Sequence, residues 1–347
     1  MRYLHIKLIF FMIITLIIVG CKPVKPLEVQ PVMDESLTST RIVFWQNYGP
    51  RCRSFPSKLH ADGSCDDGDA TLFNSLLCYA GSVESCEAVK NAQGDDGRWY
   101  RSPRKEELKM QKNSFSRDQM MGVLLYLVST KDRAGARKWL EWMENNRKCF
   151  INYVAPINGQ TCAVSVTVSC PDSPDGTCAV TPAMWQLIAE VWRFLDLPLS
   201  YRMENPWSEL GDFASLTSWI TSDISTDDVA FIETITNAKG YRLHLKGVHV
   251  LLKKAMGKQS EKLDKIVGQL RQRQPENLFF KYLDHGANVQ LAKELVQVCP
   301  NPTRMVGLRN QWAWERRDSE QAWNHSMGWD CYFLGRLMTQ KSNGLHD

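Results

Sequence analysis

Three aspartates lie in predicted helices, two of them at helix starts, where a carboxylate could take part in acid–base chemistry. Asp69 opens an apolar run that ends near residue 80, and Asp118 falls in the first turn of a predicted buried helix. Asp330 lies deeper in the last predicted helix, where a buried acid needs either an ion pair or a functional role. Glycoside hydrolysis requires two carboxylates that face each other across a bond. Helix starts also suit acids that only interact with the helix dipole, so this structural alternative stays open.

Aromatic and charged residues are mixed in two segments close to these helices. Residues 312–318 read Trp-Ala-Trp-Glu-Arg-Arg-Asp, and residues 98–102 read Arg-Trp-Tyr-Arg-Ser. Sugars stack on tryptophan and hydrogen-bond to guanidinium and carboxylate groups, so both segments suit a glycan site. If both line one cleft, an acidic glycan is a sensible ligand. A salt-bridged surface loop with buried tryptophans is the alternative. The candidate substrate-binding residues are Arg101, Arg117, Trp312, Trp314, Glu315 and Trp329.

The sequence has no convincing motif for a metal, a nucleotide or a covalent nucleophile. Residues 62–69 are acidic, but Asp67 and Phe73 stand where an EF-hand calcium loop needs glycine and glutamate. His244 and His249 are five residues apart and do not share one helical face. There is also no C-x-x-C pair, nucleophile elbow or phosphate-binding glycine loop. We therefore expect no cofactor and no metal.

Helices are predicted in pairs, each a buried helix followed by an amphipathic one. Residues 116–119 form a capping box, in which the Ser116 hydroxyl caps the helix and Gln119 bonds back to the start. The helix that follows, to about residue 130, is apolar nearly all round and must be buried. Its amphipathic partner spans 134–145. Further pairs are predicted at 69–80 with 84–92, 241–256 with 260–273 and 278–285 with 289–298, with single helices at 181–195 and 323–338.

Two helix starts resemble those of a known superfamily. Residues 113–119 and 323–330 each place an acid beside aromatic or basic residues. Together with the paired helices, they resemble the six-hairpin glycosidase superfamily. The resemblance implies a mainly α fold, an α/α toroid in which an inner ring of helices is wrapped by an outer ring. It also implies a sugar site at the ends of the inner helices. An irregular helical bundle or a solenoid would give the same pattern.

Ten cysteines follow Cys21, and in an exported chain they are expected to form up to five disulfides. Only the stretch 149–180 departs from the helical pattern. Residues 162–170 alternate apolar and polar side chains, and residues 171–176 are rich in turn formers. This predicts a small disulfide-pinned β-hairpin inserted between helices. Sequence proximity favours the pairs Cys52–Cys65, Cys78–Cys86, Cys170–Cys178 and Cys299–Cys331.

A short apolar leader ends at Ile18-Val19-Gly20-Cys21. Its basic start and apolar run are typical of a secretory signal. The apolar run is too short to cross a bilayer. The leader resembles that of bacterial lipoproteins, which is cut before a cysteine that then carries lipid such as palmitate. The resemblance implies a signal peptide over 1–20 and lipid on Cys21. Three prolines between residues 22 and 31 predict an extended, lipid-anchored tether over 21–40. No linker-like stretch divides the rest, which predicts one domain over 41–347, with two domains as the alternative. For a cell envelope with two membranes, the resemblance and Lys22 after the cysteine imply the outer membrane. An ordinary signal peptide or an uncleaved anchor is the alternative.

Charge is nearly balanced once the leader is removed. The chain has 42 basic and 38 acidic side chains, and the leader contains two of the basic residues and no acid. Binding of nucleic acid needs a concentrated basic excess, so we expect no such partner. Two alternatives remain. One is a carbohydrate-active enzyme, a glycoside hydrolase or lyase, anchored to the membrane through lipid on Cys21. The other is a lipoprotein without catalysis that binds glycan or supports the envelope.

Overall fold

The structure is a computed structural model of the 347-residue chain. All described residues lie in one compact unit, residues 32–340, and only the backbone is described for residues 150–165. The leader, Cys21 and most of the predicted tether lie outside the described residues. The described residues are 38–109, 114–155, 159–170, 178–206, 225–303, 312–317 and 328–339.

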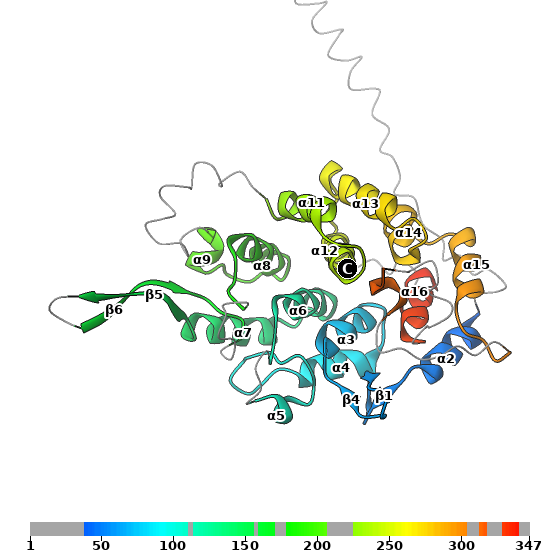
Figure 1. The fold of residues 1–347 in the computed structure, drawn as a ribbon, viewed down its shortest axis with the longest axis horizontal. Helices are drawn as coiled ribbons and strands as arrows, with labels where there is room; N and C mark the ends of the chain where they lie inside the picture. The colour runs from blue at the N-terminus through cyan, green and yellow to red at the C-terminus, as the bar shows by residue number, and fades with distance from the viewer. Residues whose placement is uncertain are drawn as a thin grey trace, which may run out of the picture. The chain divides into compact units, whose positions relative to one another are not determined.

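The described part of the chain is mainly helical, as the sequence predicts (Figure 1). Within it, no helix combines the length and the apolar character that a membrane span requires. The helices are α2 (Ser39–Tyr48), α3 (Ala70–Tyr79), α4 (Val83–Asn91), α5 (Lys105–Leu108), α6 (Arg117–Thr130), α7 (Arg133–Asn145), α8 (Pro182–Phe194), α9 (Tyr201–Glu204), α11 (Thr226–Thr236), α12 (Tyr241–Ala255), α13 (Glu261–Arg273), α14 (Leu278–His285), α15 (Val289–Val298), η2 (Ala313–Glu315) and α16 (Trp329–Thr339).

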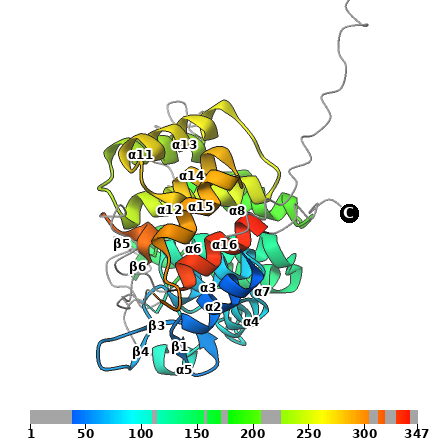
Figure 2. The same cartoon turned by 90° about the vertical axis from the view of Figure 1, so that its right-hand side faces the viewer.

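The predicted helix pairs pack against each other. Helix α3 contacts α4, α6 contacts α7, α12 contacts α13, and α14 contacts α15. Contacts between successive pairs join them into one core, because α6 packs on both α3 and α12. Figures 1 and 2 both show α12 lying between α6 and α13. The buried member of each pair therefore lies next to a buried member of another pair.

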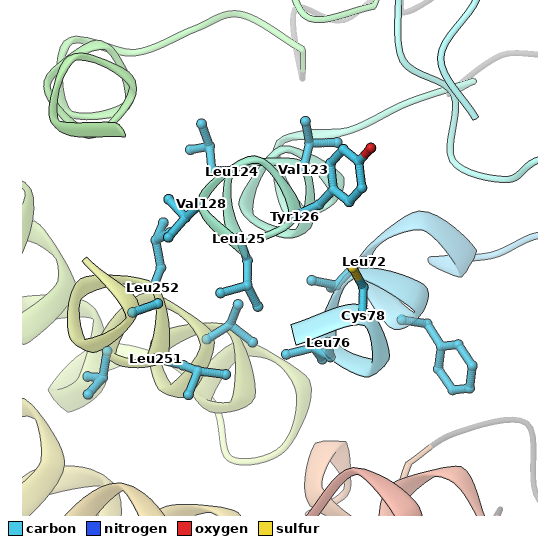
Figure 3. Packing of buried hydrophobic residues seen from close by; sticks show 14 of the residues in the cluster. Leu72, Leu76, Cys78, Val123, Leu124, Leu125, Tyr126, Val128, Leu251 and Leu252 are labelled. Atoms are coloured by element: carbon cyan, nitrogen blue, oxygen red, sulfur yellow. The ribbon is translucent and has the colours of Figure 1, made fainter. Parts of the chain in front are cut away.

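Helix α6 lies at the centre of this packing, between α3 and α12 (Figure 3). Its residues from Val123 to Val128 are all buried, which confirms that this helix is enclosed. Gly122 allows the closest approach, because a Cβ atom there would lie 2.5 Å from the Cα of Leu72 on α3. Each fully buried aliphatic side chain contributes about 1.5–3 kcal/mol to folding. The apolar core thus fixes α3 and α6 side by side.

All four predicted disulfides are confirmed. The pairs are Cys52–Cys65, Cys78–Cys86, Cys170–Cys178 and Cys299–Cys331, with Cα–Cα distances of 5.4, 4.6, 5.5 and 6.0 Å. These distances fall in the usual range for disulfides. Cys149 is disulfide-bonded as well. The bond between Cys299 and Cys331 ties the end of α15 to the start of α16, close to the site described below.

The strands are short and form antiparallel pairs. The insertion begins where predicted, but its hairpin lies earlier than the alternation at 162–170 indicates. It pairs residues 148–155 with 159–166 and has a bulge after Cys149. The prediction missed the first strand, although residues 150–154 read Phe-Ile-Asn-Tyr-Val, which favours a strand. Beyond the hairpin, Val168 and Ala179 form an isolated antiparallel β-bridge. The Cys170–Cys178 disulfide closes the loop between these two residues. The strands are β1 (Arg51–Cys52), β2 (Phe55–Pro56), β3 (Lys58–Leu59), β4 (Cys65–Asp66), β5 (Lys148–Ala155) and β6 (Gly159–Val166).

Candidate functional site

The starts of α3 and α6 are held together by backbone hydrogen bonds through one residue. The Thr71 amide donates to the Arg101 carbonyl at 2.7 Å, and the Arg101 amide donates to the Ser114 carbonyl at 2.8 Å. Asp69 precedes α3, and Asp118 lies in the first turn of α6. The two acids that the sequence places at separate helix starts are therefore neighbours in space.

Asp69 is held in an unusual conformation. Its φ of 58° lies in the left-handed region, and its side chain does not cap its own helix. Gln119 of α6 supplies the missing cap, because its Oε1 accepts a hydrogen bond from the Leu72 amide at 2.9 Å. The Nε2 of Gln119 donates to Asp69 Oδ1 at 2.6 Å, a charge-assisted bond. One buried amide thus caps α3 and positions the Asp69 carboxylate.

This arrangement corrects one prediction for the capping box at 116–119. The Ser116 hydroxyl does accept from the Gln119 amide, as expected. The expected return bond from the Gln119 side chain to the start of its own helix is wrong, because that side chain bonds to Leu72 and Asp69 instead. The reason is tertiary: the start of α3 offers both a free backbone donor and a carboxylate acceptor.

Asp118 is half-buried. Unlike Asp69, it accepts no hydrogen bond from a side-chain amide of the described residues. Burial raises the pKa of its carboxyl above the ordinary value, and the charge of Asp69 raises it further. The Tyr241 hydroxyl and the charges of Arg117 and Lys246 lower the pKa in part. The hydroxyl approaches Asp118 without completing a hydrogen bond of good geometry within the described residues. Asp118 therefore holds its proton to a higher pH than a free aspartate does.

Glu315 is the third acid at this place, and it is 7% exposed. Burial raises the pKa of its carboxyl to about 7, Lys58 opposes the rise, and Asp69 adds to it. Its Oε1 lies 3.8 Å from Nε2 of His244, a ring with no exposed surface. We call Asp69, Asp118 and Glu315 the acidic cluster. The pKa of the Tyr241 hydroxyl is raised by burial and by the charges of all three acids, which shows that they act on one place.

The short helix η2, which carries Glu315, is held by the starts of three helices. Asn277, the cap of α14, donates from Nδ2 to the Trp314 carbonyl at 3.1 Å. The Ala313 amide donates to Asp330 Oδ2 at 3.0 Å. Gly240, just before α12, lies so close to the Glu315 carbonyl oxygen that a Cβ atom would come within 2.9 Å. These contacts set the position of Glu315.

Asp330 is buried away from solvent. It has no exposed surface, and its carboxylate accepts from the backbone amides of Ala313 and Cys331 at 3.0 and 2.9 Å. These bonds join η2 to the start of α16. Asp330 therefore supports the site from within, and we assign it no contact with a substrate.

The three tryptophans predicted to stack on sugars are enclosed by the core. Trp312, Trp314 and Trp329 are 0–1% exposed. Trp314 donates from Nε1 to the Asp330 carbonyl at 3.2 Å, and Trp329 donates to the Pro50 carbonyl at 2.7 Å. Their ring faces cannot meet a ligand in this conformation. The alternative that treated them as buried tryptophans fits the geometry better.

The two candidate arginines differ in accessibility. Arg117 is exposed beside Asp118, and its charge lowers the pKa of that acid. Arg101 is half-buried, and its backbone joins α3 to α6 as described above. Its neighbour Arg98 lies over the ring of Tyr100, with 4.2 Å between the guanidinium carbon and the ring centre. Arg117 is thus the more accessible of the two candidates.

Sequence reasoning missed Gln119, Tyr241, His244 and Lys58 as members of the site. The sequence does offer a signal for Tyr241, because this residue lies in the first turn of a predicted buried helix, as Asp118 does. The role of Gln119 could not, because its partners lie 47 and 50 residues away along the chain.

A second group of buried charges joins α8, α11 and α12. Lys253 Nζ lies 2.7 Å from Glu190, 3.1 Å from Asp227 and 3.0 Å from Thr226 Oγ1. His249 Nε2 lies 2.8 Å from Asp227. Burial alone would raise the pKa of Asp227, but His249 and Lys253 outweigh it and hold the pKa below the ordinary value. We call Glu190, Asp227, His249 and Lys253 the ion network.

The described residues contain no group of three or more histidine, cysteine or acidic side chains arranged to hold a metal ion. No protein family, curated protein or solved structure matches this chain. The functional assignment below therefore rests on the geometry of the acidic cluster.

Proposed function

We propose that the protein is a carbohydrate-active enzyme, a glycoside hydrolase or lyase, whose carboxyl pair is Asp69 and Asp118. The observation that supports this most is their placement. Both side chains are half-buried at neighbouring helix starts, and among the described residues Asp69 accepts a hydrogen bond from the Gln119 side chain. The pKa of Asp118 is raised by burial and by Asp69. Two adjacent carboxyls with different environments are the arrangement that divides acid and base roles.

In hydrolysis, Asp118 would act as the general acid and donate its proton to the oxygen of the leaving sugar. Asp69, held by Gln119, would serve as the carboxylate that activates water or attacks the anomeric carbon. Water supplies the hydroxyl of the released sugar, and a proton returns to Asp118. Arg117, exposed beside Asp118, would contact the glycan. Asp330 and the tryptophans have no part in these steps.

The proposed fold is an α/α toroid of helical hairpins, with α3, α6, α8, α12, α14 and α16 as inner helices. Supporting this, the starts of α3 and α6 are bonded to each other, and those of α12, α14 and α16 all contact η2. In a toroid, the starts of inner helices share one end. The sugar site would lie at that end.

We further propose that lipid on Cys21 anchors the protein in a bacterial cell envelope, in the outer membrane. The support is the leader and its closing residues 18–21. Cys21→Ser should abolish labelling by a radioactive fatty acid. The wild-type chain is the control, and a wild-type chain that takes up no label would contradict the anchor.

The test of the activity is a panel of glycans incubated with the full chain in detergent, with release of new sugar ends as the readout. Asp118→Asn keeps the shape and should lower turnover at least about a hundredfold, the effect of losing a general acid. Glu261→Gln changes an exposed acid on α13 and serves as the control. Unchanged turnover in folded Asp118→Asn would remove this residue from the mechanism. Glycan binding without turnover would favour the alternative, a glycan-binding or structural envelope lipoprotein.

A further inference from the structure

Within the described residues, the acidic cluster lacks the counter-charges that buried acids normally have. Among the described residues, no lysine or arginine nitrogen lies within 4.0 Å of the carboxylates of Asp69, Asp118 or Glu315. Lys58 and Lys246 act on the cluster only from a longer distance, and Lys246 is already paired with Glu233. Within the described residues, the carboxyl groups of the site therefore have no cation in contact with them.

A second observation at the same place points to a missing partner. His244 has no exposed surface, and neither ring nitrogen has a hydrogen-bond partner in the described part of the chain. Burial lowers the pKa of this imidazole to about 3, so the ring is neutral and one nitrogen is an acceptor. Its Nε2 is directed at Glu315 Oε1 at 3.8 Å, too far for a direct hydrogen bond. Unpartnered buried polar atoms of this kind need a partner.

We infer that the site binds the protonated amine of a deacetylated amino sugar between the acidic cluster and His244. An ammonium group has three donors and no acceptor, so it can bond to the neutral imidazole and to the ionised form of a carboxyl in the cluster, a form that its positive charge favours. A metal ion fits less well, because no three metal-binding side chains among the described residues are arranged to hold one. An acidic glycan would be repelled by the uncompensated carboxylates. The inference rests on the proposed function, since it names the substrate class of the same site.

The experiment compares binding of three oligosaccharides of matched length to the full chain by titration calorimetry. The probes are oligomers of glucosamine, N-acetylglucosamine and galacturonic acid, and calcium chloride alone is the fourth arm. We expect the glucosamine oligomer to bind at least about tenfold more tightly than the acetylated one, since a close charge pair at a desolvated site is worth that much. Asp118→Asn and Glu315→Gln should each reduce this preference, and the exposed Glu261→Gln should not.

Each outcome has a defined meaning. Equal binding of the acetylated oligomer, tighter binding of the galacturonic acid oligomer, or no binding of the glucosamine oligomer would overturn the inference. Calcium binding that is lost in the same two variants would also overturn it, in favour of a metal site. Turnover of a neutral glycan with no preference for the amine would overturn the inference and leave the proposed function standing. Amine-dependent binding without turnover would support the inference while the proposed catalysis fails.

Discussion

In the described residues, the ion network and the acidic cluster are two groups of buried or half-buried carboxyls with opposite surroundings. In the ion network, Lys253 and His249 contact Glu190 and Asp227 within 3.1 Å. In the acidic cluster, the described residues provide no lysine or arginine within 4.0 Å. The pKa of Asp227 is accordingly lowered, whereas that of Asp118 is raised.

We propose that this difference separates a structural role, that of the ion network, from a functional role, that of the acidic cluster. The ion network joins three helices, and each of its acids contacts a basic side chain of the same network. The acidic cluster keeps acids near one another without neutralising them, which costs folding free energy and is a feature of sites that bind or transfer protons. Residue type alone does not separate the two regions, because both consist of acids at or within buried helices.

The largest expected effect comes from removing the central cation of the ion network. Lys253→Met should lower the free energy of unfolding by about 3–5 kcal/mol, because Glu190 and Asp227 lose their shared partner. Urea denaturation of the variant and the wild type measures this loss in the free energy of unfolding. Lys258→Met is the matched control, since Lys258 also pairs with Glu190 but its side chain is 45% exposed. That control should cost at most about 0.5 kcal/mol. Equal losses in the two variants would show that the network is not a buried structural unit.

The next effect is a pH dependence produced by Glu315. In the unfolded chain this acid ionises near pH 4.5, but the folded protein keeps the proton until about pH 7. Stability contributed by the protonated carboxyl is therefore present below pH 4.5 and lost as pH rises toward 7. Glu315→Gln has no such loss. Between pH 4.5 and 7, the free energy of unfolding of the variant should therefore rise by on the order of 3 kcal/mol relative to that of the wild type.

The comparison between variant and wild type is needed because the buried histidines act in the opposite direction. Burial lowers the pKa of both His244 and His249, so their contribution to stability is lost as pH falls below about 6.5. Both proteins contain these histidines, and their effect cancels in the difference. Urea denaturation at a series of pH values gives the result. A difference that stays constant from pH 4.5 to 7 would mean that Glu315 ionises normally.

A smaller effect is expected from Gln119→Met. The variant removes the cap on the Leu72 amide and the donor to Asp69, which should cost about 1–2 kcal/mol. Gln290→Met, the same change at an exposed position on α15, should stay within about 0.5 kcal/mol of wild type. Thermal unfolding compares the two. If Gln119→Met unfolds at the wild-type temperature, Gln119 does not hold Asp69 in place.

Much of the fold follows from sequence pattern. Apolar runs and caps are local signals, so α6, α12 and α14 were predicted within one or two residues. Disulfides between near neighbours were predicted because short loops bring cysteines together. The paired order of buried and amphipathic helices was predicted for the same reason, since it depends on spacing along one helix.

The site was only partly predictable. Asp69 and Asp118 were found because helix starts have a local signature. The burial of Trp312 and Trp314, and the bonds of Asp330 within the core, depend on how distant segments pack. Tryptophan in a loop suits both a sugar platform and a core, and only the fold distinguishes the two. For the same reason, the sequence could not separate the acidic cluster from the ion network.

The most direct test of this distinction is a carbon-13 NMR titration of the aspartate carboxyls, with Asp118→Asn and Asp227→Asn used to assign the signals. The ordinary aspartate pKa is 3.8. We expect Asp118 to titrate above that value because it is buried beside Asp69, and Asp227 to titrate below it because His249 and Lys253 stabilise its anion. An Asp118 that titrates at or below 3.8, or an order reversed between the two acids, would contradict the account.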